Sequence, residues 1–131
     1  MKITKICTLA LIIFIVSVNL GFCYDENSND EITPFLTYIS SYDCGLEIIS
    51  GNAKCTSYID GNSKVTSTKI SMVLQKLSSG SWIDVVKCDK TGGNSCSLEK
   101  SYEIGRGTYR VYCTFKANSE TATKKTVSKT Y

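Results

Sequence analysis

Apolar and polar side chains alternate through much of the chain, most clearly just after two glycines at 105 and 107. The apolar positions of this stretch are Tyr109, Val111, Cys113 and Phe115. A period of two is typical of a strand with one buried face and one face in water. The glycines supply the turn that precedes it. The pattern therefore predicts a strand over 107–115.

The same alternation recurs between turn signals rich in Gly, Asn, Asp and Ser. It predicts further strands at 42–48, 53–59, 66–77, 82–88, 96–104 and 121–131. The fourth breaks strict alternation, because Trp82 and Val85 share a face only if a bulge lies between them. We expect Trp82 to cover the end of the core, with ligand stacking as the alternative. In the last strand, Val127 and Tyr131 are the expected inward contacts.

Seven short strands, with no helical pattern after residue 23, predict an all-β fold. The expected architecture is an immunoglobulin-like antiparallel β-sandwich. A tyrosine that follows a glycine turn at the start of the penultimate strand is typical of a tyrosine corner. Tyr109 is the candidate for this role, and an ordinary core aromatic is the alternative.

The first 23 residues have the pattern of a secretory signal peptide with a signal helix. Lys2 and Lys5 precede an apolar run over 6–18. Gly21 and Cys23 then provide small residues at positions −3 and −1, which predicts cleavage before Tyr24. The run is shorter than the roughly 20 residues that a membrane-spanning helix needs. Phe22 disfavours lipidation of Cys23. We therefore expect a secreted protein with no membrane attachment after cleavage, an acidic disordered leader over 24–34 and a sandwich domain over 35–131.

The charge balance narrows the range of partners. Removal of Lys2 and Lys5 lowers the basic count from 15 to 13 against 12 acidic residues, so the mature net charge is +1. A chain so close to neutral gives no support for nucleic-acid binding or for docking on anionic lipid.

Five cysteines follow the signal segment: Cys44, Cys55, Cys88, Cys96 and Cys113. In an exported chain they are expected to form disulfides. Closure of adjacent strands favours Cys44–Cys55 and Cys88–Cys96 and leaves Cys113 as a buried thiol. The rival bridge is Cys55–Cys113, which would join the two sheets. The sequence has no histidine and no C-x-x-C pair, so we expect no metal site.

The absence of histidine also excludes Ser-His-Asp and Cys-His nucleophile systems. The remaining carboxylates of interest, Asp84, Asp89, Glu99 and Glu103, fall at outward or turn positions, where water solvates them. No glycine-rich phosphate loop is present. We predict neither enzymatic activity nor a cofactor.

Four outward residues have binding character: Tyr58, Arg110, Tyr112 and Lys116. Tyrosine and arginine are enriched at recognition surfaces, although a solvated strand face has the same appearance. The expected partner is an unknown protein or glycan. Lys124, Lys125 and Lys129 on the last strand fit the protection of a sheet edge.

Several short motifs occur in a familiar order: I-T-P-F at 32–35, I-S-S-Y-D-C-G-L at 39–46, L-Q-K-L-S-S-G-S-W at 74–82, G-T-Y-R-V at 107–111 and S-K-T-Y at 128–131. In this the chain resembles a group of small secreted β-sandwich proteins of uncharacterised function from Gram-positive, clostridia-like bacteria. The resemblance supports the Cys44–Cys55 bridge and implies no activity. Two hypotheses follow, a binding module at the cell envelope or in the medium and a secreted bacteriocin-like antagonist.

Overall fold

The computed structural model describes residues 35–131, so the predicted signal segment and leader lie outside the described residues. The described chain is all-β, as predicted, with eight strands and no helix. The strands are β1 (Ile39–Ile49), β2 (Asn52–Gly61), β3 (Thr68–Ser78), β4 (Ser81–Gly92), β5 (Ser95–Glu103), β6 (Thr108–Ala117), β7 (Glu120–Lys125) and β8 (Lys129–Thr130).

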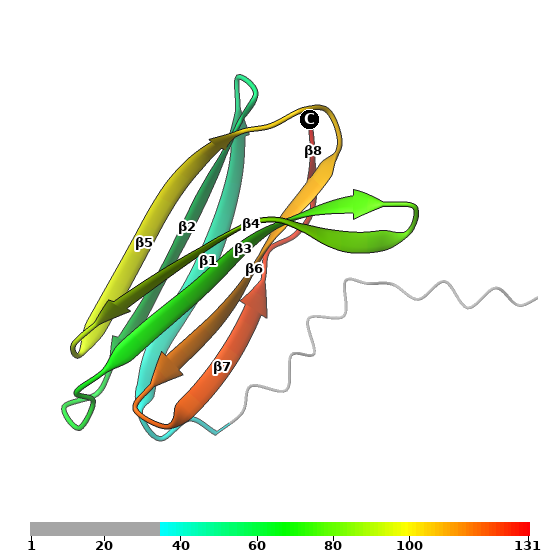
Figure 1. The fold of residues 1–131 in the computed structure, drawn as a ribbon. Helices are drawn as coiled ribbons and strands as arrows, with labels where there is room; N and C mark the ends of the chain where they lie inside the picture. The colour runs from blue at the N-terminus through cyan, green and yellow to red at the C-terminus, as the bar shows by residue number, and fades with distance from the viewer. Residues whose placement is uncertain (1–34) are drawn as a thin grey trace, which may run out of the picture. The chain divides into compact units, whose positions relative to one another are not determined.

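The strands form two antiparallel sheets that lie one in front of the other (Figure 1). The three-stranded sheet has the order β1-β2-β5. The five-stranded sheet has the order β4-β3-β6-β7, and the short β8 also pairs with β6. Consecutive strands change sheet three times, between β2 and β3, between β4 and β5, and between β5 and β6.

The core lies between the inner faces of the two sheets. On β6, Val111, Cys113 and Phe115 are completely buried, and Tyr109 and Ala117 continue the same face. Ile70, Met72 and Leu74 of β3 and Ala53, Cys55 and Ile59 of β2 are buried as well, which confirms their predicted inward positions. The ring of Tyr42 on β1 contacts that of Phe115, with 5.2 Å between the centroids.

Two of the predicted turns are tight hairpins. Ser50 and Gly51 join β1 to β2, and Ser79 and Gly80 join β3 to β4, all with positive φ. Positive φ at both central residues is the geometry of a type I′ turn, whose twist matches that of the flanking strands. The β3–β4 hairpin continues beyond the neighbouring strands and projects from the side of the sandwich (Figure 1).

The bulge predicted in the fourth strand is confirmed. Leu74 pairs with Val86 and Gln75 pairs with Asp84, which leaves Val85 as the extra residue of β4. The register beyond the bulge places Trp82 opposite Leu77, on the face of the sheet that points away from Leu74 and the core. The prediction that Trp82 covers the end of the core is therefore wrong, because the extra residue turns its side chain to the outer face.

The predicted last strand is also interrupted. Thr126 accepts a hydrogen bond from the Val111 N–H through its Oγ1 (3.0 Å) and donates its own N–H to the Val111 carbonyl. These two hydrogen bonds between Thr126 and Val111 interrupt the regular strand and separate β7 from β8. Val127 is 73% exposed and Tyr131 is 42% exposed, so their predicted inward positions are wrong, and Ala122 is the buried residue of β7 instead.

No disulfide joins the cysteines of the described residues, and the two predicted bridges stay predictions. Cys44 lies opposite Ser57, and Cys55 lies opposite Leu46. The two cysteines are therefore diagonal neighbours, farther apart than a directly opposed pair. Cys88 and Cys96 belong to strands of different sheets, although one short turn joins those strands. Nearness along the chain therefore does not place Cys88 and Cys96 on neighbouring strands of one sheet.

Tyr109 makes the hydrogen bond that a tyrosine corner requires. Its hydroxyl donates to the Gly105 carbonyl at 2.9 Å, while its ring is 3% exposed. The bond therefore ties the start of β6 to the connection that crosses from one sheet to the other, as predicted.

Removal of this hydroxyl tests its contribution. Tyr109→Phe leaves the ring in place but deprives the Gly105 carbonyl of its donor, so we expect a loss of about 1–2 kcal/mol in the free energy of unfolding. Urea denaturation measures this loss. Tyr112→Phe, on the outer face of the same strand, is the matched control, and an equal loss in both variants would contradict the role of the corner.

Glu120, at the start of β7, holds the segment that leads into β1. Its carboxylate accepts the backbone N–H groups of Thr37, Tyr38 and Ile39 at 2.6, 2.7 and 2.8 Å. Desolvation raises the pKa of this carboxyl, but the three N–H donors together outweigh it and hold the pKa below its ordinary value near 4.5. The ionised form is thus the one that the folded state stabilises.

The pH dependence of stability follows from this direction. A carboxyl with a lowered pKa in the folded state stabilises the fold above its unfolded pKa, and this contribution is lost as the pH falls through the folded pKa. We expect Glu120→Gln to flatten the decline in melting temperature between about pH 5 and pH 3. Thermal denaturation across this range measures the effect. Glu103→Gln on exposed β5 is the control, and a decline as steep in Glu120→Gln as in the wild type would refute the prediction.

Candidate binding surface

The structure separates the four predicted binding residues into two groups. Arg110, Tyr112 and Lys116 alternate along the outer face of β6 in the five-stranded sheet. Tyr58 lies on the outer face of β2 in the three-stranded sheet. The inner faces of the sheets pack together, so their outer faces point in opposite directions. Tyr58 therefore does not share a surface with the other three residues.

Arg110 is the centre of a chain of contacts that crosses three strands. Its guanidinium lies 4.2 Å above the ring of Trp82. Its Nε donates to Gln75 Oε1 at 2.7 Å, and Gln75 Nε2 donates to Asp84 Oδ1 at 2.8 Å. These contacts hold the arginine and the tryptophan in one defined arrangement on β6, β3 and β4.

Exposed apolar side chains surround this arrangement on the projecting hairpin. Leu77 is 38% exposed, Ile83 is 52% exposed and Val85 is 51% exposed. Leu77 lies directly opposite Trp82, and Ile83 lies on the other side of the hairpin. We call the set of Leu77, Trp82, Val85, Arg110 and Tyr112 the hairpin patch. It combines tryptophan, tyrosine and arginine, the three residue types most enriched in the energetic centres of protein interfaces.

The two outer faces carry opposite charge. The outward register positions of β3, β4, β6 and β7 hold five basic residues and two acidic ones: Lys69, Lys87, Arg110, Lys116, Lys125, Asp84 and Asp89. Those of β1, β2 and β5 hold five carboxylates and one lysine: Asp43, Glu47, Asp60, Glu99, Glu103 and Lys54. The hairpin patch thus borders the basic face.

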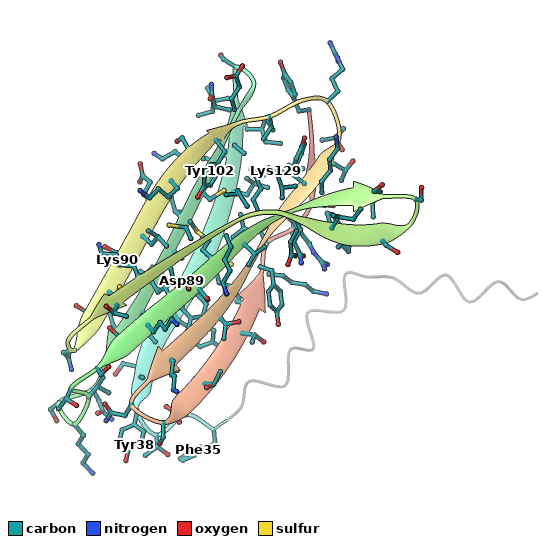
Figure 2. All side chains as sticks on the ribbon, viewed as in Figure 1. Phe35, Tyr38, Asp89, Lys90, Tyr102 and Lys129 are labelled. Atoms are coloured by element: carbon teal, nitrogen blue, oxygen red, sulfur yellow. The ribbon has the colours of Figure 1, made fainter. Side chains whose placement is uncertain are left out.

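Several of these charges are already paired. Lys69 Nζ lies 3.9 Å from Asp89 Oδ2, and Lys54 Nζ lies 3.4 Å from Glu99 Oε1. Asp89 and Lys90 are neighbours on β4 (Figure 2), and Lys90 extends to the other sheet, where its Nζ donates to the Ser97 carbonyl at 2.7 Å. Pairing of this kind at exposed positions contributes little to stability, so the sign of each face matters more for association than for folding.

A shallow hollow of about 360 Å³ lies over Gly45 on the acidic face. Gly45 has no side chain to fill it, and a Cβ at this position would lie 2.7 Å from Thr56 Oγ1. Tyr58, Asp43 and Glu99 border it. Desolvation raises the pKa of the Asp43 carboxyl, but the Lys124 ammonium, 2.9 Å away, and the Cys44 N–H together lower it below its ordinary value. Asp43 is thus committed to a contact between the edges of the two sheets.

Within 35–131, no group of three or more His, Cys, Asp and Glu side chains is placed to hold a metal ion. The same part of the chain has no helix long and apolar enough to cross a bilayer. The outward positions predicted for Asp84, Asp89, Glu99 and Glu103 agree with their exposure.

Sequence reasoning missed the partners of Arg110. Gln75 and Asp84 gave no signal of their own, because polar residues are common at outward strand positions. The one available signal was the broken alternation between Trp82 and Val85, because the bulge that it predicts also turns Trp82 to the outer face, beside Arg110.

A scan of family models and a search of curated proteins gave no match to the chain.

Trp82 is the only tryptophan of the chain, so its fluorescence reports directly on the contact with Arg110. Arg110→Ala removes the cation from the ring, and we expect greater quenching by acrylamide together with a loss of about 0.5–1 kcal/mol in the free energy of unfolding. Lys116→Ala on the same face is the control. Unchanged quenching in Arg110→Ala would show that the stacked pair does not persist in solution.

Proposed function

We propose that this chain is a secreted, non-enzymatic β-sandwich domain that binds a protein partner at the cell envelope or in the medium. The proposal of secretion rests on the signal-like pattern of residues 1–23. We further propose that the sandwich is of the immunoglobulin-like type. The division of strands into β1-β2-β5 and β4-β3-β6-β7, with the Tyr109–Gly105 hydrogen bond at the crossover, supports this assignment.

The observation that carries the binding proposal is the Trp82–Arg110 stack. A binding residue that is fixed before the partner arrives loses less conformational entropy on association. Arg110 is fixed by Gln75 on one side and by the indole ring on the other. Exposed Leu77 and Val85 add apolar area beside it. The hairpin patch therefore has a rigid polar centre with an apolar border, the composition of a protein-binding site.

The charge of the surrounding face indicates the chemistry of the partner. Lys87, Lys116 and Lys125 stand on the same face as Arg110, and a partner with an acidic surface would be attracted to them. A glycan fits the patch less well than a protein does. Sugar rings stack on an open aromatic face, and the guanidinium covers one face of Trp82.

The test is a differential capture experiment followed by affinity measurement. Surface proteins of the producing cells are passed over immobilised wild-type protein and over its Trp82→Ala variant. We expect at least one protein to be retained by the wild type and lost by the variant, and to be released as the salt concentration rises. With that protein purified, we expect Trp82→Ala to weaken binding by about 2 kcal/mol, roughly thirtyfold in Kd.

Tyr58→Ala, on the opposite outer face, is the matched control and should bind like the wild type. Equal binding by Trp82→Ala and wild type would refute the site. Capture that depends on Trp82 but is observed only on a glycan array would refute the protein partner. Circular dichroism of each variant checks that the sandwich is intact.

A further inference from the structure

Two cysteines that lie far apart in the sequence meet between the sheets. Cys44 is on β1 of the three-stranded sheet, and Cys113 is on β6 of the five-stranded sheet. Contacts on either side align the two strands. Tyr42 packs on Phe115, and Asp43 is paired with Lys124, which lies directly opposite Cys113 in the β6–β7 ladder. Cys44 is thus brought to the position of Cys113 by neighbours on both strands.

The Cys44 thiol lies near enough to Cys113 to raise the pKa of the Cys113 thiol through a hydrogen bond. The Ser57 hydroxyl donates to Met72 Sδ at 3.5 Å, and Met72 lies directly opposite Cys113 in the β3–β6 ladder. Ser57 lies directly opposite Cys44 in the β1–β2 ladder, so one cross-strand pair of the first sheet faces Cys113 of the second.

The other cysteines are less well placed to react with Cys113. Cys55 lies two positions along β2 from Ser57, and it does not hydrogen-bond to the Cys113 thiol. Cys88 lies near the Tyr102 hydroxyl, whose pKa is raised by burial and then by Cys88. Cys96 lies beside Gly92 at the β4–β5 turn. Position therefore favours one partner for Cys113, and this partner is Cys44.

We propose that Cys44 and Cys113 form a disulfide that joins the two sheets when the protein meets a disulfide oxidant, such as oxidised glutathione or a thiol–disulfide oxidoreductase. The Cys44 thiolate attacks the oxidant disulfide and releases one thiolate, which leaves a mixed disulfide on Cys44. Cys113 then loses its proton and attacks the Cys44 sulfur, and the second thiolate leaves. Two cysteine thiols are oxidised to one disulfide, and the oxidant is reduced to two thiols.

The surroundings of the two thiols determine the order of these steps. Cys44 is partly exposed, whereas Cys113 is completely buried. The hydrogen bond to Cys44 and burial both raise the pKa of the Cys113 thiol far above its ordinary value. Only the thiolate is a nucleophile. The first step therefore takes place at Cys44, and the second is slow in the folded protein and faster when the sheets can separate, as during folding.

The bridge would connect an edge strand of one sheet to a central strand of the other. Most of the sandwich, from β1 to β6, lies between the two cysteines along the chain. A cross-link that closes so long a loop removes many conformations from the unfolded state. The sheets could then no longer separate completely without reduction, which would protect the domain from proteases outside the cell.

Peptide mapping of the full-length protein tests this proposal. The reduced protein is treated with oxidised glutathione, alkylated, and digested with trypsin and a glutamate-specific protease. This digestion places Cys44, Cys55, Cys88, Cys96 and Cys113 on separate peptides. We expect a peptide pair linked through Cys44 and Cys113, and a melting temperature roughly 10 °C or more above that of the reduced protein.

Variants make the outcome decisive. Cys44→Ser, at a partly exposed position, should fold and should lose both the linked peptide and the rise in melting temperature. Cys88→Ser is the control and should keep both. A dominant Cys55–Cys113, Cys44–Cys55 or Cys88–Cys96 peptide would overturn the proposal. So would the absence of any link after oxidation, either of the folded protein or during refolding from denaturant.

Discussion

Burial of the inner face of β6 is the constraint on which the rest of the sandwich depends. This strand pairs with β3, β7 and β8 and packs across the interior against β1. Because its buried residues alternate without a break, a shift of register by one residue would move all of them to the wrong face. The register in turn decides which side chains reach the outer face, so the position of Arg110 is a consequence of the burial of Val111 and its neighbours.

Alternation predicted the strands well because the period of two is a local property, and most strands here have one buried face. It failed where the answer depended on contacts between distant segments. To predict that Trp82 lies on the outer face, one must know how the Val85 bulge changes the facing of the residues further along β4. The separation of Tyr58 from Arg110 required knowledge of which strands share a sheet. The pairing of the cysteines depends on the same knowledge, since nearness along the chain does not give nearness across the interior.

The net charge does not show how the charged residues are distributed over the two outer faces of this molecule. Taken over the expected mature chain, the basic and acidic residues almost cancel, and this gave no support for nucleic-acid binding or for docking on anionic lipid. The register divides them between two opposite faces, one mostly basic and one mostly acidic. Attraction of a partner depends on the local field over the contact surface rather than on the sum over the chain. Composition alone does not reveal this difference between the local charge of each face and the net charge of the chain.

The two ends of the described chain lie at opposite ends of the sandwich. Phe35 is at the end where β1 begins, and the terminus after β8 is at the other (Figures 1 and 2). β1 belongs to one sheet, while β7 and β8 belong to the other. A pulling force between these ends would load the strands along their length and shear one sheet past the other, so that many contacts would resist it together. Such a force would therefore meet the combined resistance of the packed sheets rather than separate one strand pair at a time.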